Sequence, residues 1–566
     1  MTSAPDRRPD QGLRWTLPIF RSLDGYRRSW LVRDLIAGSL IAAVAIPLSM
    51  GMAEVAGLPP IVGLYSCVLP LVAFAVFGSS RQVVVALDAS TAAMLAAAVT
   101  PLANGNATTY AALAGLVAVL VGVILIAAGI FRLGVLGDLL SHPVLLGYQA
   151  GLAIVVAATQ LPKVLGVDAS GGGTVAQMWG LVRNVGQADL STVTLGFASV
   201  AVIVGARAWS VRVPGALIAV GLATVAARVF DLSGHGVQVL GELPAGLSGL
   251  TWPSFTGSEL VSVTVPAAGI ALIAAADTIV CSRAFAERGG YRVETNGDLI
   301  GLGGANLASG LSGGISVSAS AARTAVAESV GSRSQVAGVV AATVMAGVLM
   351  FLTDPLQDVP IATLAAVVLV AVIRLVDVRA MAALWRIRRS ELLIALATTT
   401  GAVVIGLLEG IAIAVMLSVV DFLLRRAAPH GAVIGRISGR QGFFDVDRYP
   451  GAIVEPGLVV YRLDGPLFYA NAERVLESVR QLVADPGVRW FVLDGSAVSD
   501  VDATAARMLA ELHDELAARG IELALVDLIA GVRDTLERAG VIQRVGPHHV
   551  FDTAEDAVDA YRASTG

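Results

Sequence analysis

The chain has few charged residues and few cysteines for its length. Only 15% of its 566 residues are charged, whereas 55% are hydrophobic. This balance excludes an ordinary soluble enzyme, because most of the chain is too apolar to remain in water. Two cysteines, Cys67 and Cys281, fall inside apolar segments and provide neither a disulfide framework nor a cysteine-based metal site.

The sequence also lacks the motifs of ATP-driven pumps and of metalloenzymes. The pattern Gly-x-x-x-x-Gly-Lys is absent, and no group of His, Cys or Asp has the spacing of metal ligands. A net charge of −5 gives no support to nucleic-acid binding. We therefore expect a protein that is not an enzyme and that needs no cofactor and no nucleic-acid partner.

What the sequence does contain is a series of long apolar runs between Leu35 and Leu424. A helix of about 20 apolar residues crosses a bilayer, and none of the runs resembles a cleavable signal peptide. We predict a polytopic α-helical membrane protein with about 14 transmembrane segments, at 35–54, 60–77, 85–99, 110–130, 143–161, 190–206, 213–228, 260–282, 297–312, 318–328, 335–353, 361–373, 391–407 and 410–424. The Gly- and Ala-rich run 301–305 is expected to allow close helix packing.

The basic residues are concentrated in alternate connections between the predicted spans, as the positive-inside rule requires. The N-terminal segment 1–33 is rich in arginine, which predicts a cytoplasmic N-terminus. Alternate connections then carry the basic residues Arg81, Arg132, Arg207, Arg212, Arg283, Arg288, Arg292, Arg333, Arg374, Arg379, Arg386, Arg388, Arg389, Arg425 and Arg426. The other connections hold only Lys163, Arg183 and Arg228. Both termini are therefore predicted in the cytoplasm, with the chain in the inner (plasma) membrane.

The composition changes after Arg426, which predicts a membrane domain at 34–426 and a second, soluble domain. A Gly- and Arg-containing stretch, 427–456, is predicted as a linker. Beyond it, the domain at 457–566 shows strand patterns at 457–463, 490–494 and 521–527 and helix patterns at 472–484, 503–519 and 531–539. This alternation predicts a small α/β sheet covered on one face.

Two short spans, the third and the tenth, lie at corresponding places in the two halves of the membrane region. In 78–91 and in 313–324 an extended, Gly- and Ser-containing stretch gives way to a helix that begins in mid-membrane. Paired interrupted spans indicate a transporter binding site, because helix N-termini with free N–H groups face each other across a cavity. Such a site suits an anion.

Several sequence blocks in order resemble the SulP anion transporters, known in animals as solute carrier family 26. They are Asp34-Leu35-Ile36-Ala37-Gly38, Ala56-Gly57-Leu58-Pro59-Pro60, Gly78-Ser79-Ser80-Arg81, the run 306–314 and Arg323-Thr324-Ala325. The resemblance covers nearly the whole chain. It implies a 7+7 inverted repeat in which a core domain (helices 1–4 and 8–11) moves against a gate domain (helices 5–7 and 12–14), usually in a homodimer. It also implies that substrate lies between helices 3 and 10.

The sequence departs from the family pattern near the third helix. Ala86-Leu87 stands where Gly-Pro is common, and Leu48 stands where Gln or Glu commonly follows Pro47. These differences leave bicarbonate, sulfate, chloride and dicarboxylates open as substrates. Asp88 is either a helix N-cap or a functional carboxylate that needs a proton or a cation beside it.

Candidate site residues follow from the paired spans. The predicted substrate-binding set is Asp88, Ala89, Ser90, Ser318, Ala319, Ser320 and Arg323. Arg323 either balances Asp88 or the substrate, or is a charge at a helix end. Asp277, inside an apolar span, is either paired with Arg283 or functional, and we favour a coupling role because intramembrane carboxylates are costly. It matches the acidic position on helix 8 of the family, which implies H⁺ or Na⁺ coupling.

The soluble domain resembles a STAS domain through the loop at 493–505, which in anti-sigma-factor antagonists is phosphorylated. Thr504 is the matching hydroxyl, and it is either a regulatory site or an unmodified residue at a helix start. The sequence as a whole favours a secondary active anion transporter that works by alternating access. The alternatives are a passive anion channel and a sensory membrane protein centred on the STAS domain.

Overall fold

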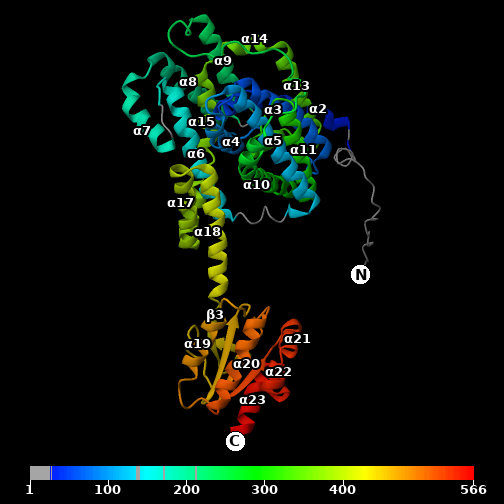
Figure 1. Cartoon of the computed structure of the whole chain (residues 1–566), viewed down its shortest axis with the longest axis vertical. Helices are drawn as coiled ribbons and strands as arrows, with labels where there is room; N and C mark the ends of the chain where they lie inside the picture. The colour runs from blue at the N-terminus through cyan, green and yellow to red at the C-terminus, as the bar shows by residue number, and fades with distance from the viewer. Residues whose placement is uncertain (1–25, 27, 135–140, 170–172, 211–212, 566) are drawn as a thin grey trace. The chain divides into compact units, whose positions relative to one another are not determined.

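The computed structural model describes residues 26, 28–134, 141–169, 173–210 and 213–565, and these residues form two compact units (Figure 1). The first unit extends to Ser418 and the second begins at Val419. Most of the predicted cytoplasmic segment 1–33, with its arginines up to Arg27, and Arg212 lie outside the described residues.

Every one of the fourteen predicted spans contains a helix. These are α2 (Arg28–Val55), α3 (Pro60–Phe77), α4 (Ala89–Ala103), α5 (Ala107–Ile130), α6 (His142–Leu165), α8 (Leu190–Trp209), α9 (Gly215–Val229), α10 (Gly257–Gly289), α11 (Thr295–Leu311), α12 (Ala321–Ser329), α13 (Val336–Phe351), α15 (Ile361–Ile373), α17 (Arg389–Val404) and α18 (Leu407–Ala427). Among the described residues, eight stretches are long and apolar enough to cross a membrane by themselves. The helix α4 is shorter because its span begins with extended backbone.

Three further helices were not predicted, because their sequences are amphipathic or very short. They are α7 (Thr174–Asn184), α14 (Thr353–Gln357) and α16 (Val378–Ile387). The helix α7 has no buried residue and lies at the periphery of the helical unit in Figure 1. These helices belong to connections between the apolar spans.

The long helices pack in two groups. In the first, α11 packs on α5 and α3, α13 packs on α2 and α3, and α10 packs on α5. In the second, α6 packs on α15 and α17, and α8 packs on α9 and α15. The pair α5 and α11 approaches closely at glycines: a Cβ on Gly303 would lie 2.7 Å from the Gly122 carbonyl oxygen. The predicted packing role of the run 301–305 is therefore confirmed.

The second unit is a six-stranded mixed sheet in the order β4-β3-β5-β6-β7-β8. Its strands are β3 (His430–Arg436), β4 (Phe443–Asp445), β5 (Leu458–Asp464), β6 (Trp490–Asp494), β7 (Glu522–Val526) and β8 (Val550–Phe551). The strands β5 to β8 are parallel, and β3 and β4 are antiparallel additions. The helices are α19 (Ala472–Leu482), α20 (Ala503–Ala518), α21 (Ala530–Arg538), α22 (Val541–Val545) and α23 (Ala554–Thr565).

Two sequence predictions for this unit were wrong. The predicted linker 427–456 contains β3 and β4. Two glycines weaken the strand pattern of β3, and β4 is only three residues long. The sheet is also covered on both faces, because side chains alternate along each strand. In β6, Phe491 and Leu493 face a core formed with α19 and α20, whereas Trp490 and Val492 face a second core formed with α23.

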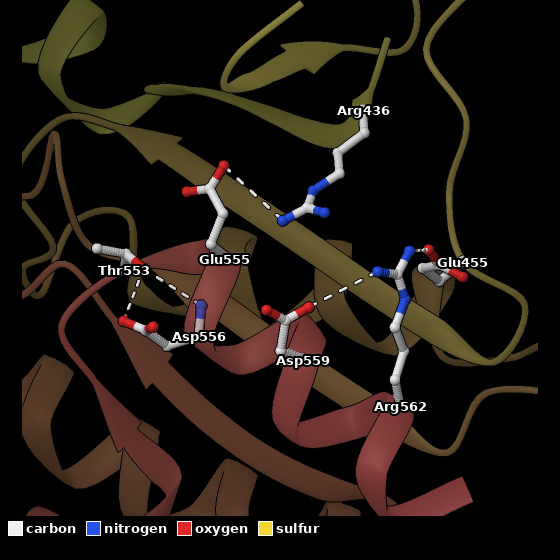
Figure 2. A network of polar contacts seen from close by, with 7 residues as sticks. All are labelled: Arg436, Glu455, Thr553, Glu555, Asp556, Asp559 and Arg562. Atoms are coloured by element: carbon white, nitrogen blue, oxygen red, sulfur yellow. Dashed lines mark hydrogen bonds and ion pairs between the residues drawn. The ribbon is translucent and has the colours of Figure 1, made fainter. Parts of the chain in front are cut away.

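Polar contacts at the start and end of α23 accompany the second core (Figure 2). The Thr553 hydroxyl donates to Asp556 across 2.7 Å and accepts from the Asp556 amide at 3.2 Å, which caps the helix. Arg436 of β3 lies 3.8 Å from Glu555, and Arg562 pairs with Glu455. The strand β3 and the segment before β5 are thereby tied to α23, so the region predicted as a linker is part of the folded unit.

Candidate functional site

The site begins where two short strands cross inside the helical unit. The strand β1 (Val85–Ala86) pairs antiparallel with β2 (Ser318–Ala319), and α4 and α12 start directly after them. The Ser320 amide donates to the Val84 carbonyl at 2.9 Å, which extends the pairing by one residue. The predicted pair of helices that begin inside the membrane domain is present, and their N-termini lie on either side of this crossing.

Extended backbone inside a membrane domain needs internal hydrogen-bond partners, because an unsatisfied group costs several kcal/mol. Asn306 of α11 supplies them for the segment before β2: its Nδ2 donates to the Val317 carbonyl, and its Oδ1 accepts from the Val317 amide, both at 3.0 Å. Ser66 of α3 accepts from the Ile315 amide at 2.9 Å. Before β1, the Val84 amide donates to the Thr324 hydroxyl at 3.0 Å. The side chains of neighbouring helices thus hold the crossing in place.

A cavity of about 450 Å³ opens beside this crossing. Six of the predicted residues line it: Asp88, Ala89, Ser90, Asp277, Ala319 and Ser320. It also contacts α2, α6 and the end of α15, so both groups of packed helices contribute to its wall. Two predicted residues, Ser318 and Arg323, do not line the cavity.

Asp277 and Asp88 are the two carboxylates among the described residues that line the cavity. Asp277 of α10 accepts a hydrogen bond from the Ser90 hydroxyl at 3.2 Å, which connects α10 to the first turn of α4. Asp88 occupies the N-cap position of α4, but its side chain closes no capping hydrogen bond. Asp88 also lines the cavity, and both alternatives for it, the helix N-cap and the functional carboxylate, stay predictions.

Arg323 lies behind the crossing and is fully buried. Its two terminal nitrogens donate to the Leu87 carbonyl at 2.9 Å and to the Ser49 hydroxyl at 3.1 Å. Its charge also acts on Asp88. The helix-end alternative for Arg323 is wrong, because the guanidinium is enclosed. Arg323 hydrogen-bonds to the segment just before α4. It does not line the cavity in which a substrate would bind.

Several residues of the cavity were not predicted from the sequence. Tyr148 and Gln149 of α6 line the cavity together with Asp88 and Asp277, as does Arg288 near the end of α10. Tyr148 is only 2% exposed, and its hydroxyl has no hydrogen-bond partner within the described structure. A Tyr-Gln pair inside the apolar run of α6 was the available signal. Among the described residues, no group of three or more His, Cys, Asp or Glu is placed to hold a metal ion.

Thr504, the predicted regulatory residue, lies in the second unit on the first turn of α20 and is exposed. The helix is capped by Asp502, whose carboxylate accepts from the Ala505 amide at 2.8 Å. The Thr504 side chain is therefore not needed for the cap and is accessible from solvent.

Comparison with known proteins gives consistent matches over both units. The sulfate permease family matches residues 31–398, and the STAS domain matches residues 449–557. A probable sulfate transporter of Mycobacterium tuberculosis is 40% identical over 542 residues, which cover 95% of this chain and 96% of that protein. Sulfate transporter 3.1 of Arabidopsis thaliana is 29% identical over 578 residues, with 97% of this chain and 87% of that protein covered.

Solved structures share the fold. Murine solute carrier 26 family member A9, an anion transporter in the inward-facing state, superimposes with a TM-score of 0.90 at 21% identity over 99% of this chain and 97% of that one. The transmembrane domain of the cyanobacterial bicarbonate transporter BicA gives a TM-score of 0.61 at 22% identity, over 69% of this chain and 98% of that one. The predicted fold class, with many apolar helices compatible with a 7+7 repeat and a C-terminal α/β domain, is confirmed. The chain belongs to the sulfate permease (SulP) family of anion transporters and carries a C-terminal STAS domain.

Proposed function

We propose that the chain is a secondary active transporter that carries a small oxyanion, with sulfate as the first candidate, together with protons. The observation that carries the proposal is one cavity that holds two carboxylates, Asp88 and Asp277, beside the starts of two facing helices. The relatives named as sulfate transporters support sulfate as the first substrate to test. Bicarbonate and dicarboxylates, and Na⁺ in place of H⁺, are the other outcomes of the experiment below.

The donors around the cavity suit an anion. The N-termini of α4 and α12 carry partial positive charge, and Ser90 and Ser320 add hydroxyls. The buried Tyr148 hydroxyl is a donor without an acceptor among the described residues, and leaving it unpaired costs about 1–3 kcal/mol. An oxyanion in the cavity would supply the acceptor. Among the described residues, Arg288 near the end of α10 is the arginine that lines the cavity, whereas Arg323 does not line it. We propose that the helix dipoles and hydroxyls at the starts of α4 and α12 hold the anion, which can then be released.

The two carboxylates support coupling. An anion that enters the cavity meets negative charge, and two like charges about 4 Å apart repel by roughly 4 kcal/mol at an effective dielectric constant of 20. Protonation of a carboxylate removes this repulsion, so anion and proton would bind together. The hydrogen bond from Ser90 makes Asp277 the central coupling residue, because it connects this carboxylate to the anion-binding turn of α4.

Two cavities on the same helices support alternating access. The first reaches Arg288, at the end of α10 that the positive-inside rule predicts to be cytoplasmic. A second cavity of about 270 Å³ lies further along α4 and α6, where Ala97 and Thr159 contribute to its wall. A movement of α4 and α12 relative to α6 and α15 would open one cavity as it closes the other. In this proposal α4 and α12 belong to the predicted core domain, and α6 and α15 belong to the predicted gate domain.

The remaining expectations are also proposals. We propose that the protein is a homodimer in the inner membrane with both termini in the cytoplasm, in keeping with its sequence. For the STAS domain we propose a regulatory role in which Thr504 is the residue to test, since its hydroxyl is exposed.

The decisive experiment is uptake into proteoliposomes that contain the purified chain. Labelled sulfate, bicarbonate and a dicarboxylate are offered while an inward proton gradient and an inward sodium gradient are imposed separately. Proton-driven accumulation of sulfate above its equilibrium level is the expected result. Equilibration without accumulation under either gradient would instead identify a passive anion pathway.

A further inference from the structure

A second polar cavity, here called the basic pocket, has a volume of about 340 Å³ and lies within the first group of packed helices. We define it by Trp30, Arg81, Gln82, Arg288, Tyr291 and Arg333. These residues come from the start of α2, the stretch before β1, the end of α10 with its following connection, and the connection after α12. Volumes of about 300–1,000 Å³ are typical of small-molecule sites.

The basic pocket carries an excess of positive charge. Among its described lining residues, three are arginines and one is acidic, Glu328, which lies 3.2 Å from Arg288. The nearby Asp34 carboxylate is already occupied by hydrogen bonds from Ser332, Ser334 and the Arg333 amide. The other two guanidinium groups therefore have no carboxylate partner among the described residues of the basic pocket.

Those two groups, on Arg81 and Arg333, rest on aromatic rings. Arg81 lies 5.8 Å from the centre of the Tyr291 ring, and Arg333 lies 5.5 Å from the centre of the Trp30 ring. Within the part of the chain that the structure describes, neither has a carboxylate at ion-pair distance. A cation–π contact at an exposed site contributes about 0.5–1 kcal/mol. A charge-assisted hydrogen bond contributes about 1.5–3 kcal/mol, so an anion that reaches these arginines would replace the weaker contact.

Two buried oxygen atoms provide an independent indication of a ligand. The Gln82 side-chain oxygen and the Tyr291 hydroxyl have no hydrogen-bond partner among the described residues, although both residues line the basic pocket. The orientation of Gln82 is fixed, because its amide nitrogen donates to the Ser332 carbonyl at 2.6 Å. The site thus offers arginine and hydroxyl donors together with one acceptor that needs a donor. Inorganic phosphate that retains one proton satisfies both requirements, and so does a phosphodiester whose headgroup carries a hydroxyl, as in phosphatidylglycerol, whereas a fully ionised sulfate does not.

We propose that the basic pocket binds a phosphate group, either as inorganic phosphate or as the headgroup of an anionic phospholipid, and that it is a site separate from the transport cavity. Arg288 lines both cavities, so a ligand that draws Arg288 from Glu328 changes the charge at the mouth of the transport cavity. Gln82 lies shortly before β1, so the same ligand also holds the stretch that leads into α4. The effect on transport rests on the proposed function, but the binding does not.

Binding is tested on the full-length protein without a transport assay. In phosphate-free detergent solution, thermal stabilisation is measured against inorganic phosphate for the wild type, for Arg81→Ala/Arg333→Ala and for Arg379→Ala, an exposed arginine of α16 outside the pocket. Each of these three proteins is also made with the additional substitution Ser320→Leu, whose larger side chain occupies part of the transport cavity. We expect phosphate to stabilise the wild type and Arg379→Ala alike, with or without Ser320→Leu. The apparent affinity of Arg81→Ala/Arg333→Ala for phosphate should be at least tenfold lower.

The lipid source is tested in nanodiscs without free phosphate. If the headgroup is the ligand, replacing phosphatidylcholine by phosphatidylglycerol raises the melting temperature of the wild type and of Arg379→Ala more than that of the double variant. Stabilisation by inorganic phosphate alone, with no lipid difference, assigns the site to the free ion. Equal responses of the wild type and the double variant to both probes would overturn the proposal.

A milder variant distinguishes a loss of ligand binding from a folding defect. Tyr291→Phe removes only the unpartnered hydroxyl, so we expect unchanged or higher stability without ligand and a several-fold weaker response to the probe that stabilises the wild type. Lower stability without ligand, combined with an unchanged response, would show that the hydroxyl serves the fold and would exclude it from the site.

Discussion

The Ser90 hydroxyl donates to the Asp277 carboxylate across 3.2 Å and so connects the first turn of α4 with the middle of the long helix α10. These residues are 187 positions apart in the chain. The bond brings a donor of the proposed anion site into contact with the proposed coupling group. A change in protonation at Asp277 therefore alters the hydrogen bonding of the very residue that would contact the anion.

The first prediction concerns Asp277→Asn. The amide is close in shape to the carboxylate and still accepts from Ser90, but it neither titrates nor carries charge. We expect gradient-driven uptake to fall to the level of empty liposomes while the purified protein remains monodisperse. Asp354→Asn, at an exposed position of α14, is the matched control and should transport normally. Unchanged ion-coupled uptake by Asp277→Asn would refute the coupling role.

The second prediction concerns space at the starts of the two half-helices. Ala89 and Ser320 are buried and line the cavity from α4 and from the residue before α12. Leucine at either position occupies part of the cavity, and we expect anion affinity to fall about tenfold or more, a loss of about 1.4 kcal/mol or more. The dependence on the coupling ion should not change.

Anion titrations of Ala89→Leu and Ser320→Leu check this expectation against Ala111→Leu, an exposed alanine near the start of α5. Normal affinity in both cavity variants would place the anion elsewhere.

The third prediction concerns Tyr148, whose buried hydroxyl has no hydrogen-bond partner in the described part of the chain. Tyr148→Phe preserves the ring packing and removes the donor. We expect the protein to remain as stable as the wild type without substrate, and anion affinity to drop about tenfold or more, because a hydrogen bond to a charged group contributes about 1.5–3 kcal/mol. Titration of the anion with thermal stabilisation as the readout measures both quantities. A less stable variant with normal affinity would argue against the donor role.

The fourth prediction concerns pH and the STAS domain. Burial, with a further contribution from Asp494, raises the pKa of Asp527. The folded domain therefore holds this proton more tightly than the unfolded chain, so the carboxyl stabilises the fold at low pH and this contribution is lost as pH rises through the raised pKa. Asp527 has a φ of 54°, a conformation that asparagine also tolerates.

Asp527→Asn should therefore make a fragment 427–566 more stable at pH 7, by less than about 1 kcal/mol because solvent screens the partly exposed group. The gain should vanish near pH 3, and thermal unfolding at both pH values measures it. A loss of stability at pH 7 would reverse the assigned sign.

Much of the fold follows directly from the sequence, because membrane helices and interrupted helices have local signals. The β-branched run Val83 to Val85 and the glycines at 313 and 314 indicate extended backbone before α4 and α12. Asn306 and Ser66, which hydrogen-bond to the backbone before α12, lie far apart in the sequence. A local sequence pattern therefore cannot show that they act together. Their role depends on how α3 and α11 pack.

The errors have similar causes. Arg323 follows the start of α12, yet its side chain reaches back to Leu87 and Ser49, a direction that the sequence does not specify. Tyr148 enters the cavity only because α6 packs beside it. In the STAS domain, the β3 pattern is weakened by Gly431 and Gly435, and its strand character comes from pairing with β4 and β5.

The last prediction concerns the separation of binding and regulation. The residues of the transport cavity all precede Ser418, the last residue of the first unit, and the second unit has its own hydrophobic cores on both faces of its sheet. Each unit thus contains what its own fold requires. Truncation after Arg426 should leave anion binding by the membrane domain largely intact, while transport rate, expression or dimer stability falls.

Ligand-induced thermal stabilisation of the monodisperse truncated protein measures binding, and uptake into proteoliposomes measures turnover. The control is a full-length Thr504→Glu variant, which adds charge at the exposed turn of α20 while leaving the Asp502 cap in place. If Thr504 is regulatory, this variant should change the uptake rate without changing anion affinity. Loss of anion binding in a well-folded truncation would instead make the STAS domain part of the transport site, because the truncation removes none of the cavity residues.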